Sequence, residues 1–530
     1  SMDILGKDAL LILDSKITDA GYVSNDLNYS LNNMFSNINF SSADGFKDSY
    51  FSAQINSVPL QFNINTIFRK KSQFTLVSTE KNLAIKKLFP HLNFFSQSKG
   101  SSDFKFDLIT SSFLRNTNYL ETKVEISTNL RGTMLKGYEP FVKTKEEKIN
   151  FKINLLQKKE NNYTELLFSY GDLIRGKLNL KDEFLEGYLI AGKKKQNIII
   201  EEGVVSLMGT FNELDIAKLS KYSSGGKSFP GTSYKIKDLL IKKTKLSSLE
   251  IKNTTINMNQ KKDEYRFIFS NSDFKTSLVY NNRSKNLFLD SEFISLKING
   301  KESEGTFLSL FNNLSIPMKF KTDSFSVNNK EYGSWSFDIV PGKKKLLLDN
   351  LSGRYDIWEI GYRLKDANSF LSIDQNILGW TTTLETKMKS MDSEKVIKNF
   401  ELNDLVNLDN LSFYPALSWK GLPNDFDLNQ VQGLLGFEIE GLEISDKEEG
   451  YVANTNMLRL VSIFNITDTF EKITNLNFKK LYKSGFEADS AKGSIAIGKD
   501  SYSTHDPIIF KSGSSEFKWI GTIEKNEAGS

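Results

Sequence analysis

The sequence predicts a protein dominated by β-strands that follow one another as an antiparallel meander. Three observations support this fold class. Apolar and polar residues alternate over many segments, turn-forming residues separate these segments, and helical spacing is confined to short stretches. The 530 residues are 39% hydrophobic and include 40 Phe, a composition that is typical of a folded chain with a large apolar surface.

The first clear strand illustrates the alternation. Val58, Leu60, Phe62 and Ile64 fall on one face, while Pro59, Gln61, Asn63 and Asn65 fall on the other. The same pattern recurs in the following sets: Phe104, Phe106 and Leu108; Val124, Ile126, Thr128 and Leu130; Ile149, Phe151, Ile153 and Leu155; Trp335, Phe337 and Ile339; Phe437 and Ile439; Phe517, Trp519 and Ile523. Each segment is therefore expected to have one apolar face.

Turns and helices are predicted between these strands. Asn281-Asn282, Gly300 and Pro341-Gly342 indicate turns. Apolar spacing of three or four predicts short helices at 78–89, 212–222, 393–400 and 456–464, which are expected to cap the sheet. We expect three consecutive parts: 1–222 and 223–416 as successive stretches of sheet, and a carboxyl-terminal region at 417–530.

The composition argues against several kinds of chemistry. The absence of cysteine excludes disulfides, thiolate metal sites and cysteine nucleophiles, and only His91 and His505 are present. The stretch "GGKS" at 225–228 lacks the earlier glycine of a phosphate-binding loop, because Lys occupies position 221. Glu438 and Glu440 alternate with apolar residues and are interpreted as solvated charges. We therefore expect no enzyme activity, no metal and no cofactor.

The net charge of +4 is spread along the chain, which disfavours nucleic-acid binding. No stretch approaches the ~18 apolar residues of a membrane span. The opening residues lead almost directly into a strand, so we expect the chain to be a piece whose targeting segment lies upstream.

Several motifs, in their order and spacing, resemble the downstream portion of the YhdP family, which comprises AsmA-like envelope proteins related in design to TamB. Trp419, Gly421 and Pro423 resemble a Trp-x-Gly-x-Pro turn of that family, and a strand with Gly433, Phe437 and Ile439 follows. Further matching residues are Leu130, Gly132, Pro140, Lys143 and Glu146; Gly209, Leu214 and Asp215; and Leu476, Phe478, Leu481, Gly485, Phe486 and Asp489.

The resemblance implies an elongated, curved antiparallel sheet that forms an apolar groove, with 417–530 as its AsmA-like carboxyl-terminal region. It also implies a periplasmic protein, anchored to the inner membrane by an amino-terminal segment outside this chain. Such a protein would move phospholipid between the inner and outer membranes and support the outer-membrane permeability barrier. Phospholipids and the two membranes are therefore the expected partners.

The alternating pattern leaves two interpretations open, because an apolar sheet face is covered either by a second sheet or by a ligand. The first interpretation gives a structural or adhesive β-sandwich protein of the envelope. The second gives a lipid groove, for which the candidate lining residues are Val58, Leu60, Phe62, Ile64, Val124, Ile126, Ile149, Phe151, Ile153, Phe437 and Ile439.

Overall fold

The computed structural model describes most of the chain between residues 11 and 524. Residues outside the description, besides the two ends, are 25–28, 56–57, 70–71, 90–94, 96, 114–118, 137–140, 159–162, 182–183, 194–197, 216–230, 247–248, 298–316, 343, 362–368, 378, 400–405, 428–429 and 445–485. The chain divides into two compact units, Ser1–Asn271 (unit 1) and Ser272–Ser530 (unit 2).

Unit 1 consists almost entirely of strands in its described part. They are β1 (Ile12–Ser24), β2 (Tyr29–Ser41), β3 (Gly45–Phe46), β4 (Ser49–Ile55), β5 (Val58–Arg69), β6 (Ser72–Leu83), β7 (Lys99–Gly100), β8 (Ser102–Phe113), β9 (Tyr119–Thr128), β10 (Thr133–Met134), β11 (Phe151–Lys158), β12 (Thr164–Tyr170), β13 (Ile174–Leu180), β14 (Leu185–Ala191), β15 (Val204–Asp215), β16 (Ser233–Leu246), β17 (Leu249–Lys261) and β18 (Glu264–Ser270). One four-residue helix, α1 (Ile85–Leu88), follows β6.

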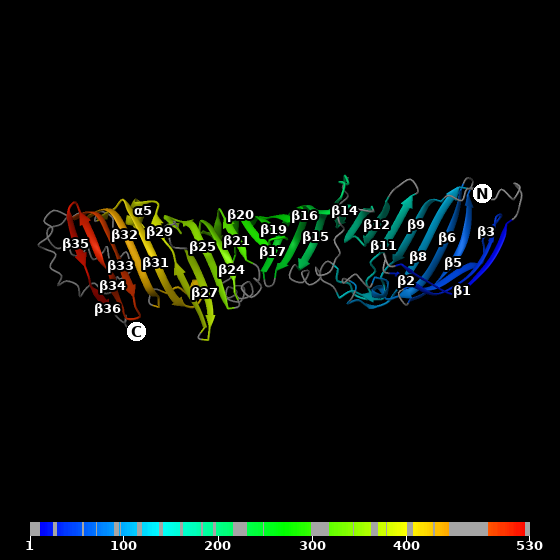
Figure 1. Cartoon of the computed structure of the whole chain (residues 1–530), viewed down its shortest axis with the longest axis horizontal. Helices are drawn as coiled ribbons and strands as arrows, with labels where there is room; N and C mark the ends of the chain where they lie inside the picture. The colour runs from blue at the N-terminus through cyan, green and yellow to red at the C-terminus, as the bar shows by residue number, and fades with distance from the viewer. Residues whose placement is uncertain are drawn as a thin grey trace. The chain divides into compact units, whose positions relative to one another are not determined.

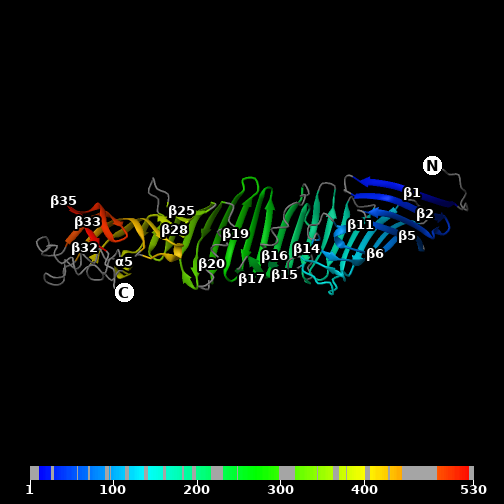
Figure 2. The ribbon, with the colours of Figure 1, turned by 90° about the horizontal axis from the view of Figure 1, so that it is seen from below.

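The strands of unit 1 form one sheet whose neighbours in space are mostly neighbours in sequence. From β1 to β14 the pairings in this sheet are antiparallel. The short strands β7 and β10 pair only with each other, also antiparallel, and form a separate sheet. β15 then pairs parallel with both β14 and β16, before β17 and β18 return to antiparallel pairing. Figures 1 and 2 show these strands side by side, each rotated against the next, so the sheet curves.

Unit 2 follows the same plan. Its strands are β19 (Phe274–Asn281), β20 (Asn286–Leu296), β21 (Met318–Thr322), β22 (Phe325–Val327), β23 (Lys330–Glu331), β24 (Ser334–Pro341), β25 (Lys345–Tyr355), β26 (Trp358–Ile360), β27 (Phe370–Asn376), β28 (Gly379–Glu385), β29 (Met388–Ser390), β30 (Val406–Asn407), β31 (Asn410–Lys420), β32 (Gln432–Ile444), β33 (Phe486–Ile497), β34 (Ser501–Ser512), β35 (Ser515–Trp519) and β36 (Thr522–Glu524). Pairing is antiparallel except where β20 pairs parallel with β21 and β22.

The core of unit 2 lies on one face of its sheet. Helix α5 (Ser393–Asn399), which the sequence predicts at 393–400, contributes Val396 and Ile397 to a buried cluster with residues of β31, β32 and β33. The short 3-10 helix η2 (Pro423–Asp425) follows β31. Mainly antiparallel β-structure with few short helices is therefore confirmed in each unit.

Two of the expected helices differ from the structure. β6 continues to Leu83, so the helix expected from Ser78 is limited to Ile85–Leu88. β15 continues to Asp215, so residues 212–215 of the second expected helix are a strand. The remainder of that helix and the one expected at 456–464 lie outside the described residues, and the boundaries expected at 222 and 416 stay predictions.

In the part of the chain that the structure describes, no helix is long and apolar enough to cross a bilayer.

Candidate functional site

The two faces of the unit 1 sheet differ in chemistry. On one face, which we call the polar face, lysines and carboxylates of neighbouring positions form ion pairs. Glu125 lies 2.8 Å from the Lys123 amine and 2.6 Å from that of Lys152, and Glu165 lies 2.5 Å from that of Lys177. Burial is the largest single influence on the Glu125 carboxyl and raises its pKa. The hydrogen bonds and charges of Lys123 and Lys152 together outweigh burial, so the pKa of Glu125 is lowered.

The opposite face, the apolar face, carries an aliphatic row that crosses seven strands. Each member pairs in register with the next, in the order Ile64, Val77, Leu108, Val124, Leu155, Leu166 and Leu178. Because paired residues share a face and strands lie ~4.8 Å apart, the row is an unbroken apolar stripe about 29 Å long. Leu108 is 36% exposed, and the other members except Ile64 are partly exposed.

A second, partly aromatic row runs beside the aliphatic row, two residues away from it on each strand. It pairs Thr79, Phe106, Ile126, Ile153 and Phe168 in register. Phe106, Ile126 and Ile153 are partly exposed and pack against a buried cluster at the adjacent strand ends. The apolar face thus becomes more buried toward that side.

A cap formed by the described parts of 84–101 and 129–150 covers this side of the apolar face. Ile85, Leu130 and Leu135 of the cap are at most 2% exposed. The rings of Phe89 and Phe95 each meet that of Phe151 edge-on, at centroid distances of 6.0 and 6.1 Å. The cap therefore fills one margin of the face with the chain's own side chains and leaves the aliphatic row accessible.

Close backbone contacts hold the cap together. β7 and β10 pair through Gly100 and Thr133, and a side chain at Gly100 would place its Cβ 2.1 Å from the carbonyl oxygen of Gly132. Lys143, 1% exposed, donates from Nζ to the carbonyl oxygens of Thr133 (2.8 Å) and Thr144 (2.7 Å). Burial lowers the pKa of the Lys143 amine.

The structure separates the predicted lining residues of unit 1 into two groups. Val58, Leu60 and Phe151 are buried in the cluster under the cap, and Ile149 lies in the cap itself. Phe62, Val124, Ile126 and Ile153 are partly exposed, with Ile64 at 9% exposure beside them. Sequence reasoning missed Val77, Leu166 and Leu178, although the alternation in β13 indicates the last of these.

Phe437 and Ile439 of unit 2 are each 5% exposed and belong to the buried cluster that includes α5. On β33 they pair with small residues, Phe437 with Gly493 and Ile439 with Ala491, and on β31 with the apolar Phe413 and Leu411. Their neighbours Glu438 and Glu440 lie on the opposite face, where the Glu438 carboxylate accepts a hydrogen bond from the Tyr414 hydroxyl at 3.1 Å. These two apolar positions therefore add no accessible surface in this structure.

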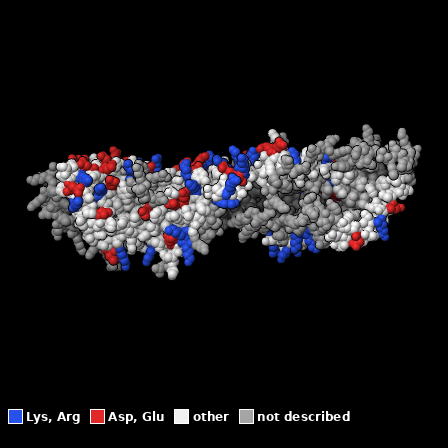
Figure 3. All heavy atoms as spheres, in the orientation of Figure 1, with Lys and Arg blue, Asp and Glu red and all other residues white. Residues whose placement is uncertain are grey.

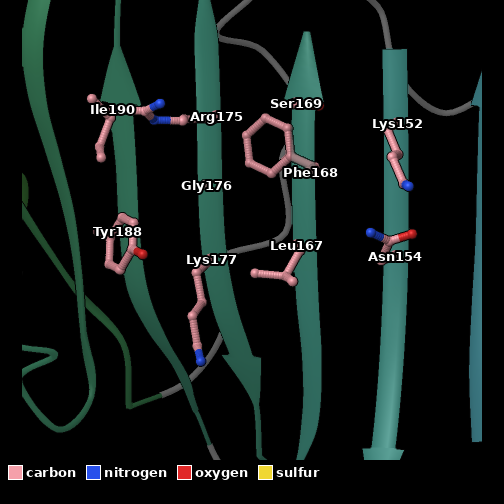
Figure 4. A pocket seen from close by; sticks show the side chains of 10 residues that line it. All are labelled: Lys152, Asn154, Leu167, Phe168, Ser169, Arg175, Gly176, Lys177, Tyr188 and Ile190. Carbon is pink, nitrogen blue, oxygen red and sulfur yellow. The ribbon is translucent and has the colours of Figure 1, made fainter. Parts of the chain in front are cut away.

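A hollow on the polar face has a lining of mixed chemistry. It has a volume of about 660 Å³, lies over β11 to β14 and is lined by residues that include Lys152, Asn154, Lys177 and Tyr188. Figure 4 shows the side chains of Lys152 and Asn154 on β11, Lys177 on β13 and Tyr188 on β14, without converging on a single point. In unit 2, Figure 3 shows basic and acidic side chains interspersed over the face in view. Among the described residues, no cluster of three or more His, Asp or Glu could hold a metal ion.

A comparison with protein-family models matches the model described as YhdP protein over residues 14–524. The chain belongs to the YhdP family. No curated protein and no solved structure matched the chain. YhdP membership over this range agrees with the large β-sheets of both units and fits a protein of lipid transport.

The YhdP-like Trp turn has a structural role. The Trp419 indole donates from Nε1 to the carbonyl oxygen of Leu422 at 3.0 Å, and the Leu422 amide donates to the Asp425 carboxylate at 2.7 Å. Gly421 has a φ of +104°, which favours glycine, and Pro423 begins η2. This turn fixes the chain between β31 and β32.

Other YhdP-like motif residues are placed only in part. Gly433 has a φ of +138° and lies opposite Leu417, and the Asp489 carboxylate accepts a hydrogen bond from the Gly513 amide at 2.8 Å. Phe486 begins β33. Leu476, Phe478, Leu481 and Gly485 lie outside the described residues.

Proposed function

We propose that the chain binds the acyl chains of phospholipids on the apolar face of unit 1 and moves these lipids between the inner and outer membranes. The observation that carries the proposal is the partly exposed aliphatic row, which the register of seven strands keeps unbroken. Membership of the YhdP family supports it. We further propose a periplasmic location with an anchor in the inner membrane, and a role in the permeability barrier of the outer membrane.

The energetics favour a passive surface over a catalytic site. A ~16-carbon chain exposed to water costs on the order of 12 kcal/mol, at about 0.8 kcal/mol per methylene. An apolar row lowers this barrier through burial alone, because the hydrophobic effect needs no directional bonds. We therefore propose that the protein acts without a chemical step and without a cofactor.

Two measurements on the full chain test the proposal. Protein purified without detergent from a Gram-negative host should release phospholipid into organic solvent, as identified by mass spectrometry. It should also accelerate the transfer of labelled phospholipid between donor and acceptor vesicles. Lipid-free protein that leaves the transfer rate unchanged would refute the proposed function.

The alternative of a structural or adhesive β-sandwich requires a second sheet over the apolar face. Within unit 1, the described strands other than β7 and β10 belong to one sheet, so this observation supports the groove. Limited proteolysis tests the alternative, because independent sandwich domains would be released as several stable fragments smaller than either unit.

A further inference from the structure

A row of threonines lies beside the aliphatic row, on the side away from the cap. Its members pair in register in the order Thr66, Thr75, Thr110, Thr122, Gln157 and Thr164. Five of six positions on six consecutive strands of the sheet therefore carry a hydroxyl on the apolar face. We call this set the threonine row.

The hydroxyls of the threonine row are available to a ligand. Thr75, Thr110, Thr122 and Thr164 are partly exposed, and none of the four has a side-chain hydrogen bond within the described residues. Thr66 differs, since its Oγ1 accepts a hydrogen bond from the Phe46 amide at 2.9 Å. The free hydroxyls include those at the centre of the row, beside the exposed Leu108 of the aliphatic row.

The spacing of the two rows matches the anatomy of a phospholipid. Residues two apart on a strand share a face and lie ~7 Å apart, so the threonine row follows the aliphatic row at that distance. An acyl chain on the aliphatic row places its ester and phosphate oxygens on the side that is not covered by the cap. Threonine hydroxyls donate hydrogen bonds to such oxygens.

We propose that the threonine row holds the glycerophosphate part of the lipid while the aliphatic row holds its acyl chain. This inference rests on the proposed lipid transport and specifies the substrate class. The row itself contains no charged residue, so it recognises the phosphodiester through neutral donors. Zwitterionic and anionic phospholipids, which share that group, are therefore carried alike, and lipids without a phosphate are held less well.

The test removes two facing hydroxyls while keeping the shape of the side chains. Thr110 and Thr122 pair directly, and Thr→Val at both positions retains a β-branched side chain suited to a strand. We expect the double variant to transfer phosphatidylethanolamine and phosphatidylglycerol roughly tenfold more slowly, from the loss of two hydrogen bonds. Transfer of diacylglycerol, which has no phosphate, should be unchanged. Thr110→Ser with Thr122→Ser should restore phospholipid transfer.

Thr255→Val is the matched control. Thr255 lies on β17 next to Ile256, which belongs to a buried apolar cluster, so the side chain of Thr255 lies on the opposite face of the sheet from that of Ile256. Unchanged phospholipid transfer by the double Val variant would overturn the assignment of the row. An equal loss of phospholipid and diacylglycerol, or a Ser variant as slow as the Val variant, would do the same. In each of these outcomes the wild-type protein still carries lipid, whereas failure of the proposed function leaves the wild type without lipid.

Discussion

Phe62 and Asn63 offer a direct test of which face of unit 1 carries lipid. They are neighbours on β5, so their side chains lie on opposite faces of the sheet. Phe62 shares the apolar face with Ile64, two residues further on, and Asn63 is exposed on the polar face. We predict that Phe62→Glu sharply reduces bound phospholipid. Asn63→Glu introduces the same charge one residue away and should leave bound lipid at the wild-type level.

The magnitude follows from the acyl contacts that a carboxylate prevents. The carboxylate that Phe62→Glu introduces keeps its water, because burying an unpaired carboxylate against hydrocarbon costs several kcal/mol. If this hydration displaces about four methylenes from the face, the loss is ~3 kcal/mol at about 0.8 kcal/mol per methylene. That difference corresponds to an affinity lower by a factor on the order of 100.

Lipid per protein is measured by mass spectrometry of solvent extracts, and affinity by titration with a fluorescent phospholipid. Phe62→Leu, which keeps an apolar side chain, controls for the lost ring contact with Phe51, whose centroid lies 6.1 Å away. Thermal unfolding verifies that all three variants are folded. Equal lipid content in the Phe62→Glu and Asn63→Glu proteins would refute the assignment of the apolar face.

Three further predictions concern stability and titration. Lys143→Met removes the hydrogen bonds to the carbonyl oxygens of Thr133 and Thr144 and should lower the free energy of unfolding by about 2–3 kcal/mol in urea titrations. Because burial lowers the pKa of Lys143, the unfolded chain binds more protons there, so wild-type stability should rise with pH toward 10.5, and the Met variant should lose this slope. Gly421→Ala should cost about 1–3 kcal/mol, because Gly421 has a positive φ and a Cβ there would lie 2.7 Å from that of Asp425; an unchanged melting temperature would contradict this. Burial, and then the hydrogen bond to Glu438, raise the pKa of Tyr414 to about 12. The stability that the protonated Tyr414 hydroxyl contributes should therefore be lost as the pH rises from 10 to 12. Ultraviolet titration should show a lower pKa of Tyr414 in the Glu438→Gln variant.

Much of the fold follows from local alternation. β5, β8, β9 and β11 were predictable because each places its apolar side chains at every second position, and their register then aligns these positions across the sheet. The turn at Pro341-Gly342 was predictable too, and the Gly342 amide closes it by donating to the Lys345 carbonyl oxygen at 2.7 Å. The short helix α5 begins near Asp392, whose carboxylate accepts a hydrogen bond from the Lys395 amide.

The remaining features depend on pairing partners far away in the sequence. Helical spacing at 78–83 is overridden because β6 pairs with β8 as far as Leu83 and Ser102. Residues 213–215 extend β15 because they pair with 243–245 of β16, where Glu213 lies opposite Lys243. The cap and the threonine row were not predicted, since both emerge only when strands from different parts of the sequence are set in register.

The parallel pairing of β14 with β15 has a consequence for anything that slides over unit 1. Two adjacent strands can run the same way only if the intervening chain travels back across the sheet, and a chain laid over the apolar face would obstruct a passing tail. In the described end of this connection, Glu201 binds Lys235 at 3.1 Å and Lys237 at 2.5 Å. These lysines flank Ile236, whose side chain points to the opposite face of the sheet and packs there against the buried cluster that includes Leu239 and Ile241. The connection at Glu201 therefore runs along the face that carries the lysines and leaves the apolar face unobstructed at this point.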